Sequence, residues 1–461
     1  MYDATIGARD GPSLISRTER IEIMAPAEGV TGPDVPGEPE SQPGGIPLYL
    51  WVIGAVALAI PAGLAWGDGA TRLNLLPSLI IRALGALAAP LVVLAILSAI
   101  VSNDIRGRQG ALMMVYYVIN TFVAMAIGLL LTNLIRPGVG AELIDLAHPP
   151  APPPKKTVTD LLVELIPRSV GDAFAQNNLA QLVLLTLALA IGLVKIRNEQ
   201  QARGETTYRV AVDLLNLGFE LLMRVLLWVV ALVPLAVFGV VASSVGQKEG
   251  LEVFRSLIWL IAVVLVGLSC QVTWYLTLMA VFARMSPPRF LRGASDVMAS
   301  TFSTASTAAT IPITLRALTG KLGVSRESSL LTACVGTNFN NDGTALYQAS
   351  AVLFMAQASG FDLGPIDQVI VVVTTLLASI GAGGIPSGSF VTLPLIFAAV
   401  GMPADKIPVL LTIDWFLDRC RTTSNVLGDM TVAVLLDRTA TPALQSIGAA
   451  AEGEKPRIFP S

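Results

Sequence analysis

The chain has little charge and a single histidine, and these two shortages exclude whole classes of protein. Only 14% of its 461 residues are charged, 53% are hydrophobic, and the mean hydropathy is +0.68. Soluble domains carry about 25% charged residues, so this composition predicts a membrane protein. The one histidine, His148, lies in a Pro-rich loop, and the serine runs lack a neighbouring base. The sequence therefore predicts no enzyme.

Cysteine is also scarce, and its three positions fit no metal or redox motif. Cys270, Cys334 and Cys420 lie in apolar runs, so we expect buried, unreactive thiols. The chain also lacks a basic block, and its net charge of −3 comes from loops and tails of mixed sign. Nothing in this charge pattern indicates a nucleic-acid partner.

Long apolar runs are what the chain has in abundance. A helix needs about 20 apolar residues to cross a bilayer, and about eight stretches of such length are present. Residues 1–45, rich in Gly, Pro, Glu and Ser, predict a disordered tail, and 439–461 form a second tail. The expected spans are 46–66, 76–101, 111–134, 179–194, 210–241, 254–283, 328–358 and 405–436.

Two further apolar segments are interrupted in the middle. Segment 288–319 is broken at 303–308, and segment 365–400 is broken at 381–389. A spanning helix with such a break would expose unpaired backbone groups to lipid, so we expect two re-entrant hairpins that end inside the protein. Because a spanning helix follows each hairpin, the pattern also predicts an inverted repeat whose tips meet near the midplane.

A third break, 336–344, interrupts the span 328–358 and contains Asp342. Freed carbonyl groups and a buried carboxylate suit a dehydrated monovalent cation. A hydrogen-bonded kink is the alternative interpretation, but a kink needs no charge.

The last span carries charges that a lipid-facing helix cannot hold. At about 100° per residue, six polar side chains fall within an arc of roughly 100° on one face. Each charged residue at the centre of a spanning helix costs about 2.5–3.5 kcal/mol unless it is paired or hydrated. We therefore expect a substrate or ion site on this face. The six residues are Asp414, Asp418, Arg421, Thr422, Asn425 and Asp429.

Lysine and arginine are concentrated in alternate loops, and this pattern predicts the orientation. The richer loops should face the cytoplasm, which would place both termini there in a multi-pass protein of the cell (plasma) membrane. The basic residues of that side are Arg106, Arg108, Lys195, Arg197, Arg203, Arg209, Arg284, Arg289, Arg292, Lys321 and Arg326.

Four segments resemble the signatures of the dicarboxylate/amino acid:cation symporters, and the likeness is greatest to the glutamate and aspartate transporters. These segments are 310–314, 340–348, 378–381 and 414–429. The resemblance implies an all-α integral membrane protein with eight transmembrane helices, two re-entrant hairpins, inverted repeats and an elevator-type moving domain. It also implies a homotrimer in the lipid bilayer. Residues 46–285 would be mainly scaffold, although 111–135 and 254–283 would move, and 286–438 would be the transport core.

The function that the resemblance implies is secondary active, sodium-coupled symport of an acidic amino acid, aspartate or glutamate. Asp418 would bind the substrate amino group, Arg421 its side-chain carboxylate and Asn425 its main-chain carboxylate. The chemistry agrees, because a guanidinium forks onto a carboxylate and a buried carboxylate suits an ammonium group. Further substrate contacts are expected from Ser306, Thr307, Thr344, Gly384 and Thr422.

Sodium is the cofactor that the resemblance implies, with no organic cofactor, and oxygen ligands suit this hard cation. Closing a hairpin over the substrate and the ion would couple their binding. The implied sites are Asp429 with carbonyls of Gly336, Asn340 and Asn425; Asp342 with Tyr117, Asn120, Thr121 and Asn340; and carbonyls near Asn338, Ser379, Ile380 and Ala382.

Several positions depart from the family pattern. Ala308 replaces a hairpin serine, Asn341 replaces a methionine and Asn120 replaces a threonine. The added amides predict a sodium affinity that differs from that of relatives. Gln348 stands where proton-coupled relatives have a glutamate, which predicts no coupled proton by this route.

Some alternatives stay open at the level of sequence. The polar hairpins would also suit a channel, or a carrier with anion-channel activity. A neutral amino acid would leave Arg421 unpaired, and a C4-dicarboxylate would leave Asp418 without an amino group. Arg419 lies off the polar stripe, where it either approaches Asp418 from the other side or forms a structural salt bridge.

Overall fold

The computed structural model describes residues 48–102, 107–140, 163, 166–176, 178–246, 250–382, 388–404 and 407–439. All of them belong to one compact unit, Pro33–Ser461, and every regular element among them is a helix. The predicted tail 1–45, the Pro-rich loop around His148 and the hairpin residue Gly384 lie outside the described residues, and so does the predicted tail 439–461 except for Thr439, which ends α16.

The first half of the chain supplies long apolar helices. Where the sequence predicts one span over 210–241, the structure has two helices, α7 and α8, that meet at Leu232. Pro234 explains the boundary, because a proline has no N–H to donate and fits the first turn of a new helix. The elements are α1 (Leu48–Trp66), η1 (Gly67–Asn74), α2 (Leu75–Ser102), α3 (Gly107–Ile135), α5 (Val170–Ala175), α6 (Leu179–Ala202), α7 (Thr207–Ala231), α8 (Val233–Gly246) and α9 (Gly250–Val281).

Five stretches of the described chain are long and apolar enough to cross a membrane. The first contains both α1 and α2, and large apolar side chains on several of the five are open to the surroundings, such as Leu134 at 77% and Trp228 at 70%. These exposed side chains are suited to lipid. The stretches are Leu48–Val101, Arg108–Ile135, Gln181–Ala202, Thr207–Gly246 and Arg255–Val281.

The cysteine prediction is wrong in part. Cys270 is exposed on α9, and Cys334 and Cys420 are half-buried. An apolar helix surface that faces lipid accepts a thiol as readily as a core does, so an apolar sequence neighbourhood does not imply burial inside the protein.

The second half of the chain contains all three predicted helix breaks. The structure separates α10 from α11 at Ala305 and Ser306, and α14 from α15 at residues outside the described ranges. Ala305 has a left-handed backbone with φ 52°, and the Ser306 hydroxyl caps α11 by accepting from Ala309 N at 3.2 Å. The elements are α10 (Pro287–Thr304), α11 (Thr307–Arg316), η2 (Ala317–Leu322), α12 (Arg326–Leu330), η3 (Leu331–Val335), η4 (Gly336–Asn338), α13 (Asp342–Ala358), α14 (Pro365–Ala382), α15 (Gly388–Ala399) and α16 (Pro408–Thr439).

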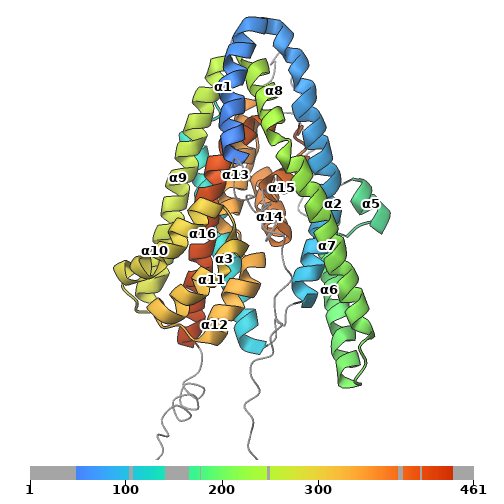
Figure 1. The fold of residues 1–461 in the computed structure, drawn as a ribbon, viewed down its shortest axis with the longest axis vertical. Helices are drawn as coiled ribbons and strands as arrows, with labels where there is room; N and C mark the ends of the chain where they lie inside the picture. Colours follow the sequence, from blue (N-terminus) through green and yellow to red (C-terminus); the bar gives the residue numbers. More distant parts are fainter. Residues whose placement is uncertain are drawn as a thin grey trace, which may run out of the picture. The chain divides into compact units, whose positions relative to one another are not determined.

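Helix α13 is the centre of this arrangement. It is buried on nearly all sides and packs against α3, α9, α14 and α16 (Figure 1). Its approach to α3 needs a glycine, because a Cβ on Gly128 would lie 2.7 Å from the carbonyl oxygen of Leu346. Helix α16 packs in turn against α9, α10 and α13. The polar start of α13 and the polar face of α16 therefore meet inside the protein.

Candidate functional site

Arg421 is the only described arginine with a side chain that is fully withdrawn from the surface, at 0% exposure. Its Nη1 donates to Asp414 Oδ1 and its Nη2 donates to Asp418 Oδ1, each at 2.7 Å. The guanidinium also lies over the ring of Tyr347, 4.1 Å from the ring centre. Two carboxylates and one aromatic face therefore fix a single cation in the interior.

Asp414 was predicted to lie on the polar site face but was given no ligand role, and Tyr347 was not among the predicted site residues. Asp414 lies seven residues before Arg421 on the polar stripe, which is two helical turns and hence the same face. Tyr347 lies in the segment 340–348, which the sequence already singles out.

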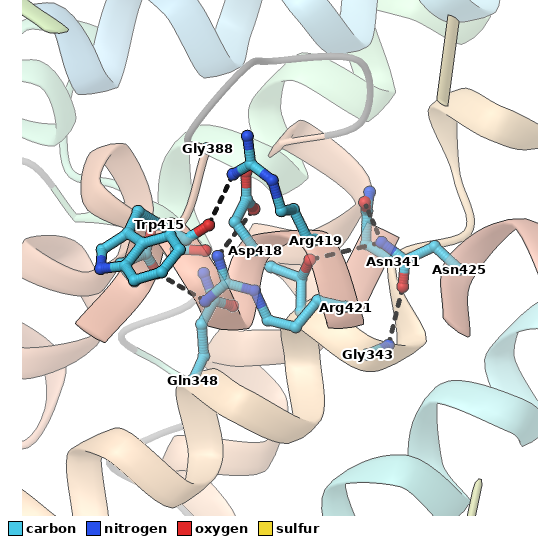
Figure 2. A network of polar contacts seen from close by, with 12 residues as sticks. Asn341, Gly343, Gln348, Gly388, Trp415, Asp418, Arg419, Arg421 and Asn425 are labelled. Carbon is cyan, nitrogen blue, oxygen red and sulfur yellow. Dashed lines mark hydrogen bonds and ion pairs between the residues drawn. The ribbon is translucent and has the colours of Figure 1, made fainter. Parts of the chain in front are cut away.

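Asn425 joins the start of α13 to α16, as Figure 2 shows. Its Oδ1 accepts from Gly343 N at 2.8 Å, and its Nδ2 donates to Asn341 Oδ1 at 3.3 Å and to Thr344 Oγ1 at 3.4 Å. Gly343 permits this approach, since a Cβ there would lie 2.9 Å from the carbonyl oxygen of Arg421. The predicted contacts Thr344, Arg421 and Asn425 are therefore brought together.

Thr422 is buried on the same helix, next to Arg421. Among the described residues, no hydrogen bond joins the first hairpin tip to this network. Ser306 makes local bonds, to Ala309 N and to the Thr304 hydroxyl, while α11 as a whole packs against α16. The predicted roles of Ser306 and Thr307 stay predictions.

Asp429 lies deeper on the same helix and is surrounded by neutral donors. Its Oδ1 accepts from Tyr117 Oη at 3.1 Å and from Asn340 Nδ2 at 3.0 Å, and its Oδ2 accepts from Thr337 Oγ1 at 3.2 Å. Asn340 Nδ2 also donates to the carbonyl of Asn425 at 2.8 Å. Asn340 therefore links the Asp429 cluster to Asn425.

Gly336 must be a glycine at this point. A Cβ on it would lie 1.9 Å from the Tyr117 hydroxyl. Its carbonyl, predicted as an ion ligand, accepts from the backbone N–H groups of Phe339 at 2.7 Å and Asn340 at 2.9 Å. A carbonyl has two lone pairs, so both are engaged in the short turn before α13.

Asp342 forms a second cluster of neutral donors. Thr121 Oγ1 donates to its Oδ1 and Tyr275 Oη to its Oδ2, both at 2.7 Å. The predicted ligand Asn120 lies nearby, with its Oδ1 accepting from Trp274 Nε1 at 3.0 Å. Sequence reasoning missed Tyr275, because α9 is apolar and no polar pattern singles this residue out.

The third predicted ion site lies where α14 ends, at Ala382. Asn341 Nδ2 donates to the carbonyl of Ser379 at 3.0 Å, which connects α14 to the start of α13. The last four carbonyls of a helix lack partners within it, so those of Ser379, Ile380 and Ala382 are suitable oxygen ligands. Asn338 is half-buried on η4, and its Nδ2 donates to the Cys334 carbonyl at 3.5 Å.

Arg419 takes neither of the two places that the sequence allows. Its Nη1 donates to the carbonyl of Trp415 at 2.7 Å, and its guanidinium lies 4.8 Å from the ring centre of Tyr49. The rings of Tyr49 and Trp415 stack with centroids 6.2 Å apart. This cation is therefore held by one aromatic ring and one backbone carbonyl where α1 meets α16.

Two observations show that the residues fit a small cation. Among the described ion pairs, none involves Asp342 or Asp429, although both carboxylates are buried. The buried side-chain oxygen Asn340 Oδ1 has no hydrogen-bond partner. Buried carboxylates without cationic partners are costly, and an oxygen-lined cation site would offset that cost.

A network of buried charges inside apolar helices defines an integral membrane protein that handles charged solutes. Comparison with known proteins shows the family to which the chain belongs. The model of the sodium:dicarboxylate symporter family matches residues 48–439. The chain belongs to this family, which consists of transporters and not enzymes.

Three relatives show the range of the family. The chain is 27% identical to excitatory amino acid transporter 3 of Homo sapiens, over 81% of this chain and 80% of the relative. It is 27% identical to excitatory amino acid transporter 1 of Ambystoma tigrinum, over 80% of this chain and 77% of the relative. It is 30% identical to the C4-dicarboxylate transport protein of Anaeromyxobacter sp. (strain K), over 85% of this chain and 89% of the relative.

Proposed function

We propose that this protein is a sodium-coupled symporter that takes up an acidic amino acid, aspartate or glutamate, across the cell membrane. The observation that carries the proposal is the pairing of Arg421 with Asp414 and Asp418, beside the amide of Asn425. A substrate carboxylate would replace one aspartate on the guanidinium fork, and the released Asp418 would accept the substrate amino group. Such an exchange needs a substrate that has both a carboxylate for Arg421 and an amino group for Asp418.

Sodium coupling follows from the balance of charge. The site contains four buried or half-buried carboxylates and two such guanidinium groups, those of Arg421 and Arg419, so it has two more negative charges than positive ones. An acidic amino acid adds another net negative charge. Cations must enter with it, because uncompensated buried charge is strongly unfavourable. The four carboxylates are Asp342, Asp414, Asp418 and Asp429.

The hydrogen-bond network offers a route for this coupling. Asn340 contacts both Asp429 and Asn425, and Asn425 contacts Gly343 and Thr344. An ion at Asp429 would therefore order the amide that holds the substrate, and the substrate would order the ion site to the same extent.

We extend the proposal to the movement and the assembly. Helices α3 and α9 pack against α13 and α16, which supports their moving as one body with α10 to α16 in an elevator-type step. The remaining helices would form the scaffold of a homotrimer. Eight spans with both termini in the cytoplasm complete the proposed arrangement.

A C4-dicarboxylate is the second candidate, because one of the relatives is a C4-dicarboxylate transport protein. Asp418 separates the two candidates. A dicarboxylate without an amino group would leave this carboxylate beside two further anions, whereas an amino acid supplies an ammonium partner.

The test is uptake of labelled L-aspartate into liposomes that contain the purified full-length protein. We expect saturable uptake with an inward sodium gradient and none when choline replaces sodium. Unlabelled glutamate should compete, and unlabelled malate and succinate should not. Asp418→Asn should abolish aspartate uptake, while Asp296→Asn, at an exposed aspartate paired with Lys321, should not.

Uptake of succinate in place of aspartate would favour the second candidate, a C4-dicarboxylate transporter. Counterflow of aspartate would distinguish a carrier from a channel.

A further inference from the structure

The Asp342 carboxylate is held by two hydroxyl groups, and these two differ in a way that matters for ion binding. The carboxylate is fully buried, and its two oxygens accept from Thr121 and Tyr275 at the same distance, 2.7 Å. A cation that binds this carboxylate must displace or share these donors.

Thr121 can release Asp342 without losing a hydrogen bond. Its hydroxyl lies 2.8 Å from the carbonyl oxygen of Tyr117, one turn earlier on α3. A hydroxyl has one proton and two lone pairs, so Thr121 can donate to Tyr117 and still offer an oxygen to a cation. Thr121 therefore suits the role of ligand.

Tyr275 has only Asp342 as a hydrogen-bonded acceptor among the described contacts, and it is itself fully buried. The side chain of Gln271, one turn earlier on α9, lies beside both Tyr275 and Asp342. Its Nε2 donates to the carbonyl of Asn120 at 3.3 Å, while its buried Oε1 has no hydrogen-bond partner. The side chain that lies beside the Tyr275 hydroxyl therefore carries an acceptor without a donor, which a turn of the amide would bring to this hydroxyl.

We propose that Tyr275 is a positioning residue that competes with sodium for Asp342, and that the Gln271 amide turns so that its Oε1 accepts a hydrogen bond from the Tyr275 hydroxyl when the ion binds. This inference rests on the proposed sodium coupling and concerns the side chains that set the affinity of one ion site. With the site empty, Tyr275 stabilises the ionised carboxylate. When sodium binds, the Tyr275 hydroxyl exchanges its hydrogen bond to the charged Asp342 carboxylate for one to the neutral Gln271 amide. The new hydrogen bond is weaker, so the exchange weakens sodium binding.

The test is a sodium titration of the purified full-length protein without substrate, at constant ionic strength with choline chloride. The readout is the midpoint of thermal unfolding, because a ligand that binds the folded state raises it. We expect Tyr275→Phe to lower the half-saturating sodium concentration about fivefold, since the competing hydrogen bond is gone. Tyr116→Phe, on the neighbouring helix α3, serves as the matched control and should leave the titration unchanged.

A second variant tests the role of Gln271. Gln271→Met removes the alternative acceptor, so it should raise the half-saturating concentration about fivefold when Tyr275 is present and have no effect in the Tyr275→Phe background. An unchanged or weaker sodium response in Tyr275→Phe would overturn the inference and leave the symporter proposal standing. A wild-type protein without any sodium response would overturn both.

Discussion

Two pairs of helices in this molecule pack in opposite ways. Helix α8 lies against α1 and η1 through small residues: a Cβ on Gly63 of α1 would lie 2.5 Å from the Ala242 carbonyl oxygen, and one on Gly246 would lie 2.4 Å from that of Gly67 in η1. Helix α13 meets α16 through buried amides, hydroxyls and carboxylates. The first contact depends on shape alone, whereas the second contains charges that only ions and substrate can balance.

This difference has a consequence for stability. Sodium and substrate should stabilise the α13–α16 contact and have no effect on the α1–α8 contact, because bound ligands stabilise only the structure that binds them. Substitutions in the two places should therefore produce different responses to sodium. The following variants test this comparison, from the largest expected effect to the smallest.

The largest effect is expected from Asp429→Asn. In the wild type, Asn340 Nδ2 donates to the Asp429 carboxylate at 3.0 Å. The substitution removes the negative charge and puts a second amide group next to this donor. We expect sodium to lose at least about a hundredfold in apparent affinity, or about 3 kcal/mol. Sodium-dependent thermal unfolding measures it, with Asp296→Asn as the exposed control. A full sodium response in Asp429→Asn would exclude this carboxylate as an ion ligand.

Two glycine variants separate the regions directly. In Gly336→Ala the new Cβ would displace the Tyr117 hydroxyl, and Tyr117 is one of the expected sodium ligands, so sodium affinity should fall about tenfold. In Gly63→Ala the clash is with backbone of α8, and we expect a loss of about 1–3 kcal/mol in stability with no change in sodium affinity. Both are read from the same thermal titration. Equal sodium affinities in the two variants would contradict the comparison.

Asn341→Met is expected to have a smaller effect. Asn341 occupies the Ser379 carbonyl through a 3.0 Å hydrogen bond, and methionine would leave that carbonyl free for an ion. We predict an increase of about threefold to fivefold in sodium affinity, measured by sodium titration of aspartate binding. An unchanged sodium dependence of aspartate binding would show that the Asn341 amide does not compete with sodium for the Ser379 carbonyl at the end of α14.

The smallest effect is expected from Arg419→Lys. The guanidinium lies over the Tyr49 ring at the α1–α16 contact, and a cation–π contact of this kind contributes about 0.5–1 kcal/mol. Lysine keeps the charge, so stability should change by less than that and aspartate affinity should stay constant. A fall of tenfold or more in aspartate affinity would instead place Arg419 in the substrate pocket.

The sequence predicts the helices and the breaks well because both rest on local rules. Apolar length defines α2 and α3, and a run of small polar residues ends α10. Partners are harder to predict. Nothing in the apolar helix α9 marks Tyr275 as the partner of Asp342, since that contact joins positions 67 residues apart. Asp414 was visible on the polar stripe, but its bond to Arg421 depends on which rotamers the packing allows.

The break between α7 and α8 shows a different reason for a miss. Hydropathy is continuous across 210–241, so an apolar-run criterion merges the two helices, while Pro234 ends the hydrogen-bond ladder between them. Backbone chemistry at one residue overrides a pattern that extends over thirty.

The most direct test of the central proposal is the substrate preference of Arg421→Cys. Wild type and variant are reconstituted into liposomes, and uptake of labelled L-aspartate and L-serine is measured under the same inward sodium gradient. If Arg421 binds the substrate side-chain carboxylate, the variant loses aspartate uptake and keeps or gains sodium-dependent serine uptake. Aspartate uptake by the variant at the wild-type affinity would contradict the assignment of Arg421 as the carboxylate-binding residue.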